Sequence, residues 1–214
     1  AGADTCDADA DGLREMAKFL LTKGVTAFCP TTMTVSNEEI AKSLETVRSC
    51  MADKEGARIV GGNMEGPFIS PAKKGAQGDE FLQAPDFDVC KAFYDGCGGI
   101  IRLVDIAPEC DVRGDFIEKA SKLCTVSVAH TATDYDGAKA AFRRGATHAT
   151  HLFNAMSGMT HRAPGVVGAV FDTDTVCGEL ICDGIHIHPA VVRTAFRQMP
   201  GRICVVSDAM RLSG

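Results

Sequence analysis

The feature that most constrains the fold is a regular alternation of Val- and Ile-rich segments with stretches of helical periodicity. Seven segments are typical of strands, at residues 25–29, 57–64, 99–105, 126–129, 147–150, 178–182 and 203–207. Helical spacing or a capping pattern falls before or between them, at residues 7–23, 36–51, 87–94, 112–123, 135–144 and 189–198. Strands that are apolar on both faces and alternate with helices predict an α/β protein whose parallel sheet is covered on both sides.

Polar residues at the strand ends decide between an open doubly wound sheet and a barrel. Residues capable of chemistry stand at or just beyond the carboxyl ends of most of these segments: Glu65, His130, His151, Asp183 with His186, and Asp208. Barrels of the TIM type build their active sites at this edge. We therefore predict that residues 1–214 form one (β/α)8 TIM-type barrel domain that lacks one strand. Two long loops, at residues 66–85 and 154–168, are expected to be functional.

Charge and composition exclude several classes of protein. Lys plus Arg is 22 against 28 Asp plus Glu, so the net charge of −6 gives no general attraction to nucleic acid or to an anionic membrane. We expect no membrane span and no signal peptide, and hence a cytoplasmic location. The ten cysteines form no Cys-x-x-Cys pair, which favours buried free thiols over a zinc ribbon or a disulfide framework.

Taken singly, the strand-end residues have ordinary explanations. Glu65 can be a solvated carboxylate, His130 and His151 can be structural histidines, and Asp208 can be the N-cap of a following helix. Together, one carboxylate and two imidazoles at the ends of barrel strands form a ligand set for zinc or another divalent transition metal. Such an ion activates water, and Asp208 is then placed to accept the proton of that water and return it to a leaving amine. This is sufficient machinery for hydrolysis of an amide.

Two further segments indicate a phosphorylated substrate. Asn154 and Ala155 lie in a turn directly after His151, and Arg162 follows in a loop. Backbone amides and a guanidinium suit a phosphate, although Arg162 can also be a solvent-facing cation. For His186 we prefer a hydrogen bond to substrate over a third histidine ligand, whereas His188 is expected to be a helix cap or a surface residue.

The series of motifs resembles the N-acetylglucosamine-6-phosphate deacetylase family of the amidohydrolase superfamily, in order and over nearly the whole chain. The motifs are Gly24-Val25-Thr26 with Pro30-Thr31-Thr32, Glu65-Gly66-Pro67-Phe68 with Lys73-Lys74-Gly75, Ala129-His130-Thr131, the run from Gly145 to Met156, Arg162-Ala163-Pro164-Gly165, Asp183-Gly184-Ile185-His186 and Ser207-Asp208-Ala209-Met210. The resemblance implies a metal-dependent barrel enzyme that converts N-acetylglucosamine 6-phosphate to glucosamine 6-phosphate and acetate in amino-sugar catabolism. It also implies a homodimer and a divalent ion, with zinc preferred and one or two ions possible.

The resemblance implies roles for individual residues. Glu65, His130 and His151 match the metal ligands, and Asp208 matches the general base and acid. Asn154, Ala155 and His186 match substrate contacts, and Arg162 matches an arginine that reaches the phosphate in the neighbouring subunit.

The chain departs from the family pattern in two respects. Gln77 stands where the family has a histidine that helps to polarise the acetamide carbonyl, and it donates a hydrogen bond without carrying a charge. The family's first barrel strand, last helix and small β-sandwich domain have no counterpart here, so we expect a piece of a longer protein. Two alternatives stay open: an amidohydrolase that acts on another N-acyl sugar phosphate, and an inactive or merely phosphosugar-binding remnant.

Overall fold

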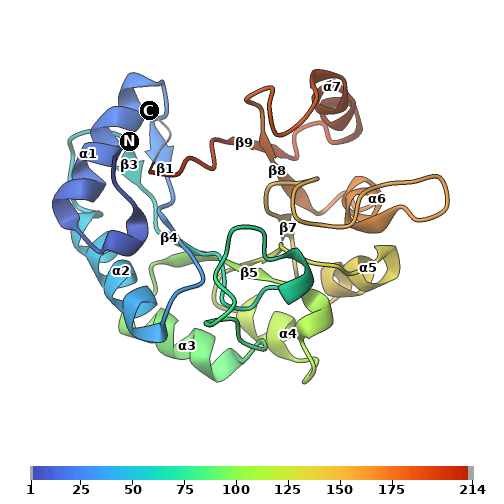
Figure 1. The fold of residues 1–214 in the computed structure, drawn as a ribbon, viewed down its shortest axis with the longest axis horizontal. Helices are drawn as coiled ribbons and strands as arrows, with labels where there is room; N and C mark the ends of the chain where they lie inside the picture. The colour runs from blue at the N-terminus through green and yellow to red at the C-terminus, as the bar shows by residue number, and fades with distance from the viewer. Residues whose placement is uncertain (1, 212–214) are drawn as a thin grey trace.

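The strands are parallel and curl into a half-barrel, with the helices packed on its outside (Figure 1). The computed structural model describes residues 2–211. Within that range a seven-stranded sheet has the order β2-β4-β5-β6-β7-β8-β9, and a second sheet pairs β1 with β3. The strands are β1 (Ala27–Phe28), β2 (Thr31–Thr32), β3 (Arg58–Ile59), β4 (Gly62–Met64), β5 (Ile101–Ile106), β6 (Thr125–Val128), β7 (His148–Ala149), β8 (Cys177–Ile181) and β9 (Ile203–Val206).

Each of the seven predicted strand segments contains a strand, but β2 lies beyond the first segment and was not predicted, and the second segment is divided into β3 and β4. Pro30 lies between β1 and β2 and has no backbone N–H to donate to a neighbouring strand. Gly61, between β3 and β4, has a φ of 149°, and a Cβ at this position would lie 2.5 Å from the carbonyl oxygen of Ile100. Each interruption therefore follows from the local backbone chemistry, and the parallel order of the strands is preserved.

The helices cover the outer face of the sheet in chain order. They are α1 (Ala10–Thr22), α2 (Asn37–Cys50), α3 (Phe87–Gly96), α4 (Phe116–Ala120), α5 (Tyr135–Arg143), α6 (Gly165–Phe171) and α7 (Pro189–Gln198), with short 3-10 turns at Thr5–Asp7, Pro71–Lys73 and Pro108–Cys110. The predicted capping box of α2 is confirmed, because Ser36 accepts from the N–H of Glu39 while Glu39 accepts from the N–H of Ser36. His188 is the N-cap of α7 and accepts from the N–H of Ala190, as the sequence indicated.

Two helical predictions are wrong. The helix expected over 112–123 is shorter, because Gly114 has a φ of 71° and donates its N–H to the carboxylate of Asp111 at 3.0 Å, which makes a turn. The segment 154–168, expected to be a loop, contains the start of α6. In that helix Gly168 has no side chain to collide with Pro164, since a Cβ would come within 2.4 Å of the proline ring.

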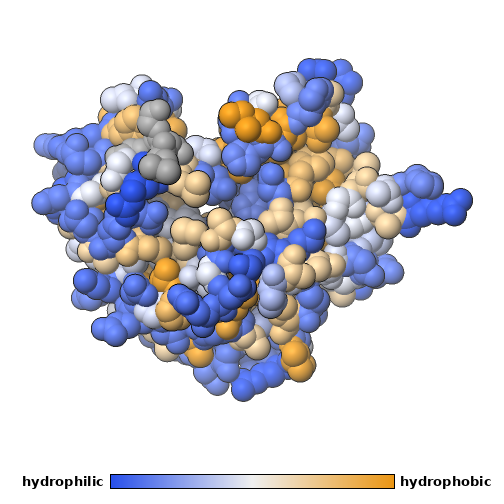
Figure 2. Space-filling view, viewed as in Figure 1, coloured by the Kyte–Doolittle hydropathy of each residue, from blue (hydrophilic) through white to orange (hydrophobic). Residues whose placement is uncertain are grey.

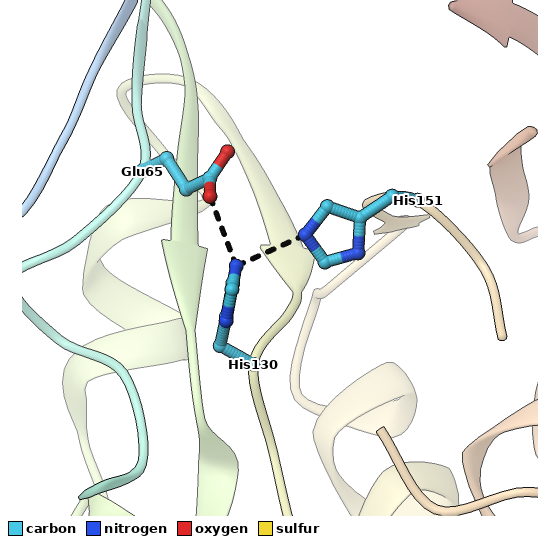
Figure 3. A group of neighbouring side chains, drawn as sticks. All are labelled: Glu65, His130 and His151. Carbon is cyan, nitrogen blue, oxygen red and sulfur yellow. Dashed lines mark hydrogen bonds and ion pairs between the residues drawn. The ribbon is translucent and has the colours of Figure 1, made fainter. Parts of the chain in front are cut away.

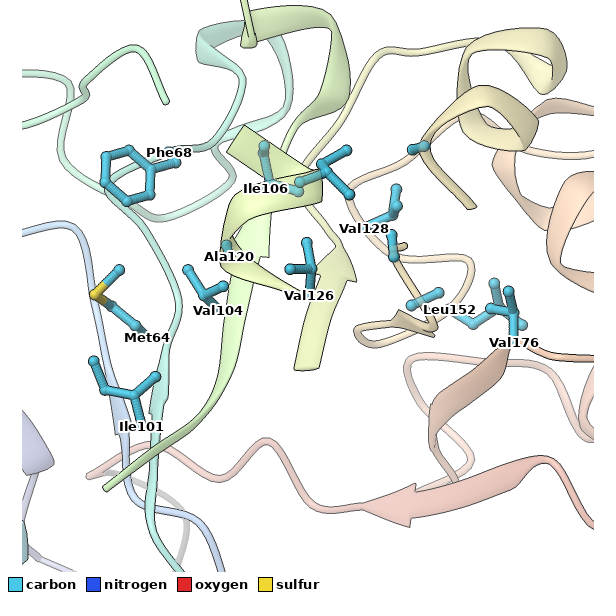
Figure 4. Close-up of a cluster of buried hydrophobic side chains, with 14 of the residues drawn as sticks. Met64, Phe68, Ile101, Val104, Ile106, Ala120, Val126, Val128, Leu152 and Val176 are labelled. Atoms are coloured by element: carbon cyan, nitrogen blue, oxygen red, sulfur yellow. The ribbon is translucent and has the colours of Figure 1, made fainter. Parts of the chain in front are cut away.

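The core between sheet and helices is built from the outward-facing residues of the strands (Figure 4). Val104 and Val126 pair across β5 and β6, and both are fully buried in a cluster that includes Phe116 of α4. The Phe116 ring meets the Phe68 ring edge-on, with centroids 5.0 Å apart. Complete burial of such side chains stabilises the fold by about 1.5–3 kcal/mol each. This packing fixes the strands whose ends carry the predicted site.

The sheet is open among residues 2–211, since β2 and β9 each pair on one side only. Figure 1 shows the gap between the α1 side and the β8–α7 side, and Figure 2 shows a notch at the same place. The thiols of Cys177, Cys182 and Cys204 are exposed near this open side. The expectation of buried thiols is therefore wrong for these three, because no second layer covers β9 in the part of the chain described. No helix within residues 2–211 combines the length and the apolar character needed to cross a bilayer.

Candidate metal centre and active site

Three predicted ligands meet at the carboxyl ends of the strands (Figure 3). Glu65 follows β4, His130 lies two residues beyond β6, and His151 lies two residues beyond β7. The Nε2 atom of His130 lies 2.9 Å from Oε1 of Glu65 and 3.0 Å from Nε2 of His151. All three side chains are buried, and one possible ligand atom from each lies within 4.8 Å of the other two. The structure thus brings together the residues that the sequence predicted as a cluster.

The ring of His130 is oriented by its second nitrogen. Nδ1 lies 2.8 Å from the carbonyl oxygen of Lys73, which only accepts, so Nδ1 carries a proton and donates it. The lone pair of the neutral ring therefore lies on Nε2, at the atom that points into the cluster. Glu109 holds the adjacent backbone, because its carboxylate accepts from the N–H of Ala132 and the hydroxyl of Thr131.

The ring of His151 is held differently. Its Nε2 atom points at His130, but its Nδ1 atom is buried without a hydrogen-bond partner among the described residues. Its backbone has a φ of 33°, in the left-handed region that non-glycine residues rarely occupy. His130 shares this feature, with a φ of 42°. Such strain persists only where the surroundings enforce it, and it is common at functional sites.

Glu65 and Gln77 form the other side of the cluster. The side-chain amide of Gln77 donates to Oε1 of Glu65 at 2.9 Å and accepts from the N–H of Thr34 at 2.6 Å. Burial raises the pKa of Glu65, but the hydrogen bond and charge of His130 outweigh it and lower the pKa overall. For His130, burial lowers the pKa and the bond to Glu65 raises it, with a net increase. Both shifts favour the charged forms, a carboxylate at Glu65 and an imidazolium at His130, in the absence of a metal.

Asp208 lies at the open side of the half-barrel, two residues after β9. Asp208 is exposed, yet partial desolvation and the negative charge of Glu65 raise its pKa, while the neighbouring His151 lowers it. Its φ of 47° is also left-handed. Glu65 and His151 both act on the pKa of Asp208, so the aspartate lies within electrostatic range of the cluster, and its role as a proton acceptor stays a prediction.

The turn after His151 lies beside the cluster, but the arginine loop does not. Asn154 donates from its backbone N–H and its side-chain amide to the carbonyl of His151, and the carbonyl of Ala155 accepts from Thr131. Arg162 is exposed, in the segment between β7 and α6 that extends away from the sheet (Figure 1). No ion pair of Arg162 occurs within residues 2–211. The predicted phosphate contact of Arg162 stays a prediction.

His186 stands in a turn organised by Asp183. The Asp183 carboxylate accepts from the N–H groups of Ile185 and His186, and its other oxygen lies 2.7 Å from Nδ1 of His186. The backbone hydrogen bonds, with the imidazole, hold the pKa of Asp183 at about 2. The exposed His186 ring is thus fixed in orientation, and its charge lowers the pKa of Asp208. His186 lies on the Asp208 side of the site, outside the three-residue cluster.

The cluster fits a metal ion by the chemistry of its donors. The lone pair of neutral His130 at Nε2 would face a carboxylate oxygen, which also only accepts, at 2.9 Å. A proton or a cation must lie between such atoms. One carboxylate oxygen and two imidazole nitrogens form the type of set that binds zinc and related divalent ions.

Several residues that orient the side chains of this site were not predicted from the sequence. Glu109 and the carbonyl of Lys73 orient His130, while a buried group of Asp105, Ser127 and Thr150 lies beneath His151. Asp105 and Ser127 are polar residues within otherwise apolar strands, which was a signal in the sequence, whereas Glu109 and Lys73 lie in 3-10 turns and gave none.

A cleft of about 390 Å³ lies at the other end of the strands. It is lined by residues at or before the starts of β5, β6 and β7, among them Ile101, Thr125 and Thr147. None of the predicted site residues lines it, and it has no cluster of titratable groups that would carry amide hydrolysis.

No family model matches the chain, but curated proteins and solved structures are similar to it. N-acetylglucosamine-6-phosphate deacetylase of Bacillus subtilis (strain 168) is 37% identical over 219 residues, covering 100% of this chain and 55% of the relative. The Homo sapiens enzyme of the same name is 34% identical over 225 residues, with the same two coverages. This chain is homologous to the N-acetylglucosamine-6-phosphate deacetylases. It spans about half the length of these curated relatives.

Solved structures of the deacetylase family agree with the fold. The Mycobacterium smegmatis deacetylase matches 98% of this chain and 55% of its own, with a TM-score of 0.89 and 30% identity. A mutant of that enzyme in complex with N-acetyl-D-glucosamine-6-phosphate matches with a TM-score of 0.90 at 29% identity. The half-barrel of this chain therefore has the same fold as the corresponding part of these deacetylase structures.

Proposed function

We propose that the protein hydrolyses the N-acetyl group of N-acetylglucosamine 6-phosphate, giving glucosamine 6-phosphate and acetate in amino-sugar catabolism. The observation that carries the proposal is the convergence of Glu65, His130 and His151 in a chain homologous to deacetylases over its whole length. The crystallised complex of a related enzyme with the amino-sugar phosphate supports the choice of substrate. The proposal treats residues 1–214 as part of one barrel domain of this enzyme.

The three clustered residues would hold a divalent ion, for which we propose zinc, as one or two ions. Nitrogen and oxygen donors in this combination suit zinc, and the Nδ1 hydrogen bond of His130 keeps its Nε2 lone pair directed at the site. When bound, such an ion acidifies water and polarises a carbonyl. Glu65 contributes the negative charge that attracts the ion, and Gln77 holds that carboxylate in place.

Asp208 moves the proton. It accepts a proton from the water that attacks the acetyl carbon, and it returns the proton to the amine nitrogen as the carbon–nitrogen bond breaks. Desolvation and the charge of Glu65 raise the pKa of Asp208, which suits a group that must both take up and release a proton.

The remaining predicted residues contact substrate in this proposal. Gln77 uses one amide N–H for Glu65, so its second N–H is available to the acetyl oxygen. Asn154, Ala155 and His186 face the sugar phosphate. Arg162 lies on the extended segment and would contact the phosphate in a partner subunit, which requires a homodimer. A cytoplasmic location agrees with the ten free thiols.

Acetate release by the zinc-loaded intact protein tests the proposal. Asp208→Asn should lower kcat by about 10²–10⁴-fold, the usual contribution of a general acid–base group. Asp136→Asn, an equal change of charge on the exposed start of α5, should leave kcat unchanged. Equal rates for the two variants would remove Asp208 from the mechanism. An equal kcat/KM for N-acetylglucosamine with and without its phosphate would remove the phosphate roles of Asn154 and Arg162.

A further inference from the structure

The two histidines of the cluster are held in place by different means. His130 donates from Nδ1 to the carbonyl of Lys73, which fixes the ring directly. Metal-binding histidines usually make such a bond with the second nitrogen. His151 makes none among the described residues, because its Nδ1 is buried and without a partner. The position of the His151 ring therefore depends on its backbone, which is itself in the left-handed region.

Buried hydrogen bonds hold that backbone from the β5 and β6 side. The Thr150 hydroxyl, next to His151, donates to Oδ1 of Asp105 at 2.8 Å and lies 2.7 Å from the Ser127 hydroxyl. Asp105 and Ser127 are completely buried, and Thr150 nearly so. Ser127 also pairs with His148 in the sheet register. A hydroxyl in such surroundings has no water to exchange with, so its position is specified by these two partners.

A second carboxylate holds the same segment from the β8 side. Oε1 of Glu179 lies 3.1 Å from Nε2 of His148, and Oε2 accepts from the backbone N–H of His151 at 3.4 Å. Both side chains are mostly buried, at 13% and 15% exposed. Residues 148–151 are therefore hydrogen-bonded on two sides, by the carboxylates of Asp105 and Glu179, and neither carboxylate is part of the metal cluster.

We propose that Asp105 and Glu179 are positioning residues for the ligand His151, acting through Thr150 and through the backbone of residues 148–151. The inference rests on the proposal that Glu65, His130 and His151 bind a metal, and it does not depend on the substrate. Asp105 and Glu179 touch neither the ion nor the reacting atoms in this account. They keep His151 in a backbone conformation that it would not hold by itself.

The test compares metal affinity in three threonine variants of the intact, metal-stripped protein. Thr150→Val keeps the shape and removes the hydroxyl, and it should weaken Zn²⁺ binding by about 10–100-fold in competition with a chromophoric chelator. It should also change the visible absorption of the Co²⁺-loaded protein. Thr150→Ser keeps the hydroxyl and should stay within about threefold of wild type. Thr32→Val is the matched control, because Thr32 is as buried and its hydroxyl has no partner within residues 2–211.

A second variant covers the case in which Thr150→Val fails to fold. Glu179→Gln keeps the volume but removes the negative charge and one of the two carboxylate oxygens that contact Nε2 of His148 and the N–H of His151, so Zn²⁺ affinity should fall about tenfold. Unchanged affinity and an unchanged Co²⁺ spectrum in the folded variants, with only a lower Tm, would overturn the positioning role. Wild-type protein that binds Zn²⁺ but releases no acetate would refute the proposed function and leave this inference standing.

Discussion

Replacing Asp105 by asparagine should make the protein more stable at neutral pH and change how its stability depends on pH. Asp105 is completely buried, and its Oδ2 atom has no partner among the described residues. Burial, reinforced by the negative charges of Glu65 and Glu179, raises the pKa of Asp105 well above its usual range. Asparagine has the same shape, keeps an acceptor for Thr150 and never ionises.

The sign and size of this change in stability follow from the linkage between protonation and folding. Well below the unfolded pKa of about 3.9 the Asp105 carboxyl is neutral in both states, so its stabilising contribution is fully present. Above that pH the unfolded chain releases the proton while the folded chain keeps it. The free energy of unfolding then falls by about 1.4 kcal/mol for each pH unit, until the folded carboxyl ionises. The asparagine variant lacks this loss, so its advantage over wild type should grow as the pH rises from 4.5, by at most about 1.4 kcal/mol for each pH unit.

Urea denaturation followed by circular dichroism, in chelator and at several pH values, measures this difference. Other titrating groups are common to both proteins and cancel in the comparison. Asp136→Asn, on the exposed start of α5, should follow wild type within about 0.5 kcal/mol throughout. A constant gap between wild type and Asp105→Asn from pH 4.5 to pH 7 would refute the reasoning, since Asp105 would then ionise in the fold as readily as in the unfolded chain.

Three further predictions concern packing and the metal. Gly165→Ala should destabilise the protein by about 1–3 kcal/mol in urea titrations, because φ is 60° and a Cβ would lie 2.5 Å from the carbonyl of Gly158. Gly158→Ala, where a Cβ meets nothing within 4 Å, should cost much less, and similar losses would contradict the steric account. Gln77→Leu removes the donor to Glu65 and should cost about 1–3 kcal/mol, with no loss if that hydrogen bond is unimportant. Chelation should lower the Tm, and Zn²⁺ at 100 times its Kd should restore about 2.7 kcal/mol, whereas a Tm indifferent to Zn²⁺ would argue against a metal in the cluster.

Much of the fold was predictable because apolar periodicity reports burial directly. Each of the seven predicted segments contains a strand and the capping box at Ser36 and Glu39 is present, whereas β2 at Thr31–Thr32 was not predicted. The helix α6 was missed because its two glycines and adjacent valines favour turn and strand over helix. It forms because its first six residues are buried, and packing outweighs intrinsic propensity.

The three candidate metal ligands were predictable from the sequence, but the residues that orient them were not. Glu65, His130 and His151 stand at strand ends, and the geometry of parallel strands brings such positions together. The partners of these residues come from other strands and loops, as the bond of His130 to the carbonyl of Lys73 shows. Every residue has a backbone carbonyl, so the sequence does not indicate which one accepts such a hydrogen bond. The contact of Arg162 with a second subunit stays a prediction.

Backbone strain at the strand ends shows why this support matters. Six non-glycine residues have positive φ within residues 2–211, and five of them belong to the site or to the turn beside it: His130, His151, Phe153, Ala155 and Asp208. Each such conformation costs about 1–3 kcal/mol, so the local motif alone does not prefer it. Glu109 offsets this cost at the turn after His130, and Asp105 and Glu179 do so around His151. The geometry of the ligands is therefore encoded in buried polar residues of neighbouring elements, and transplanting the ligand motifs without those residues should fail to reproduce the site.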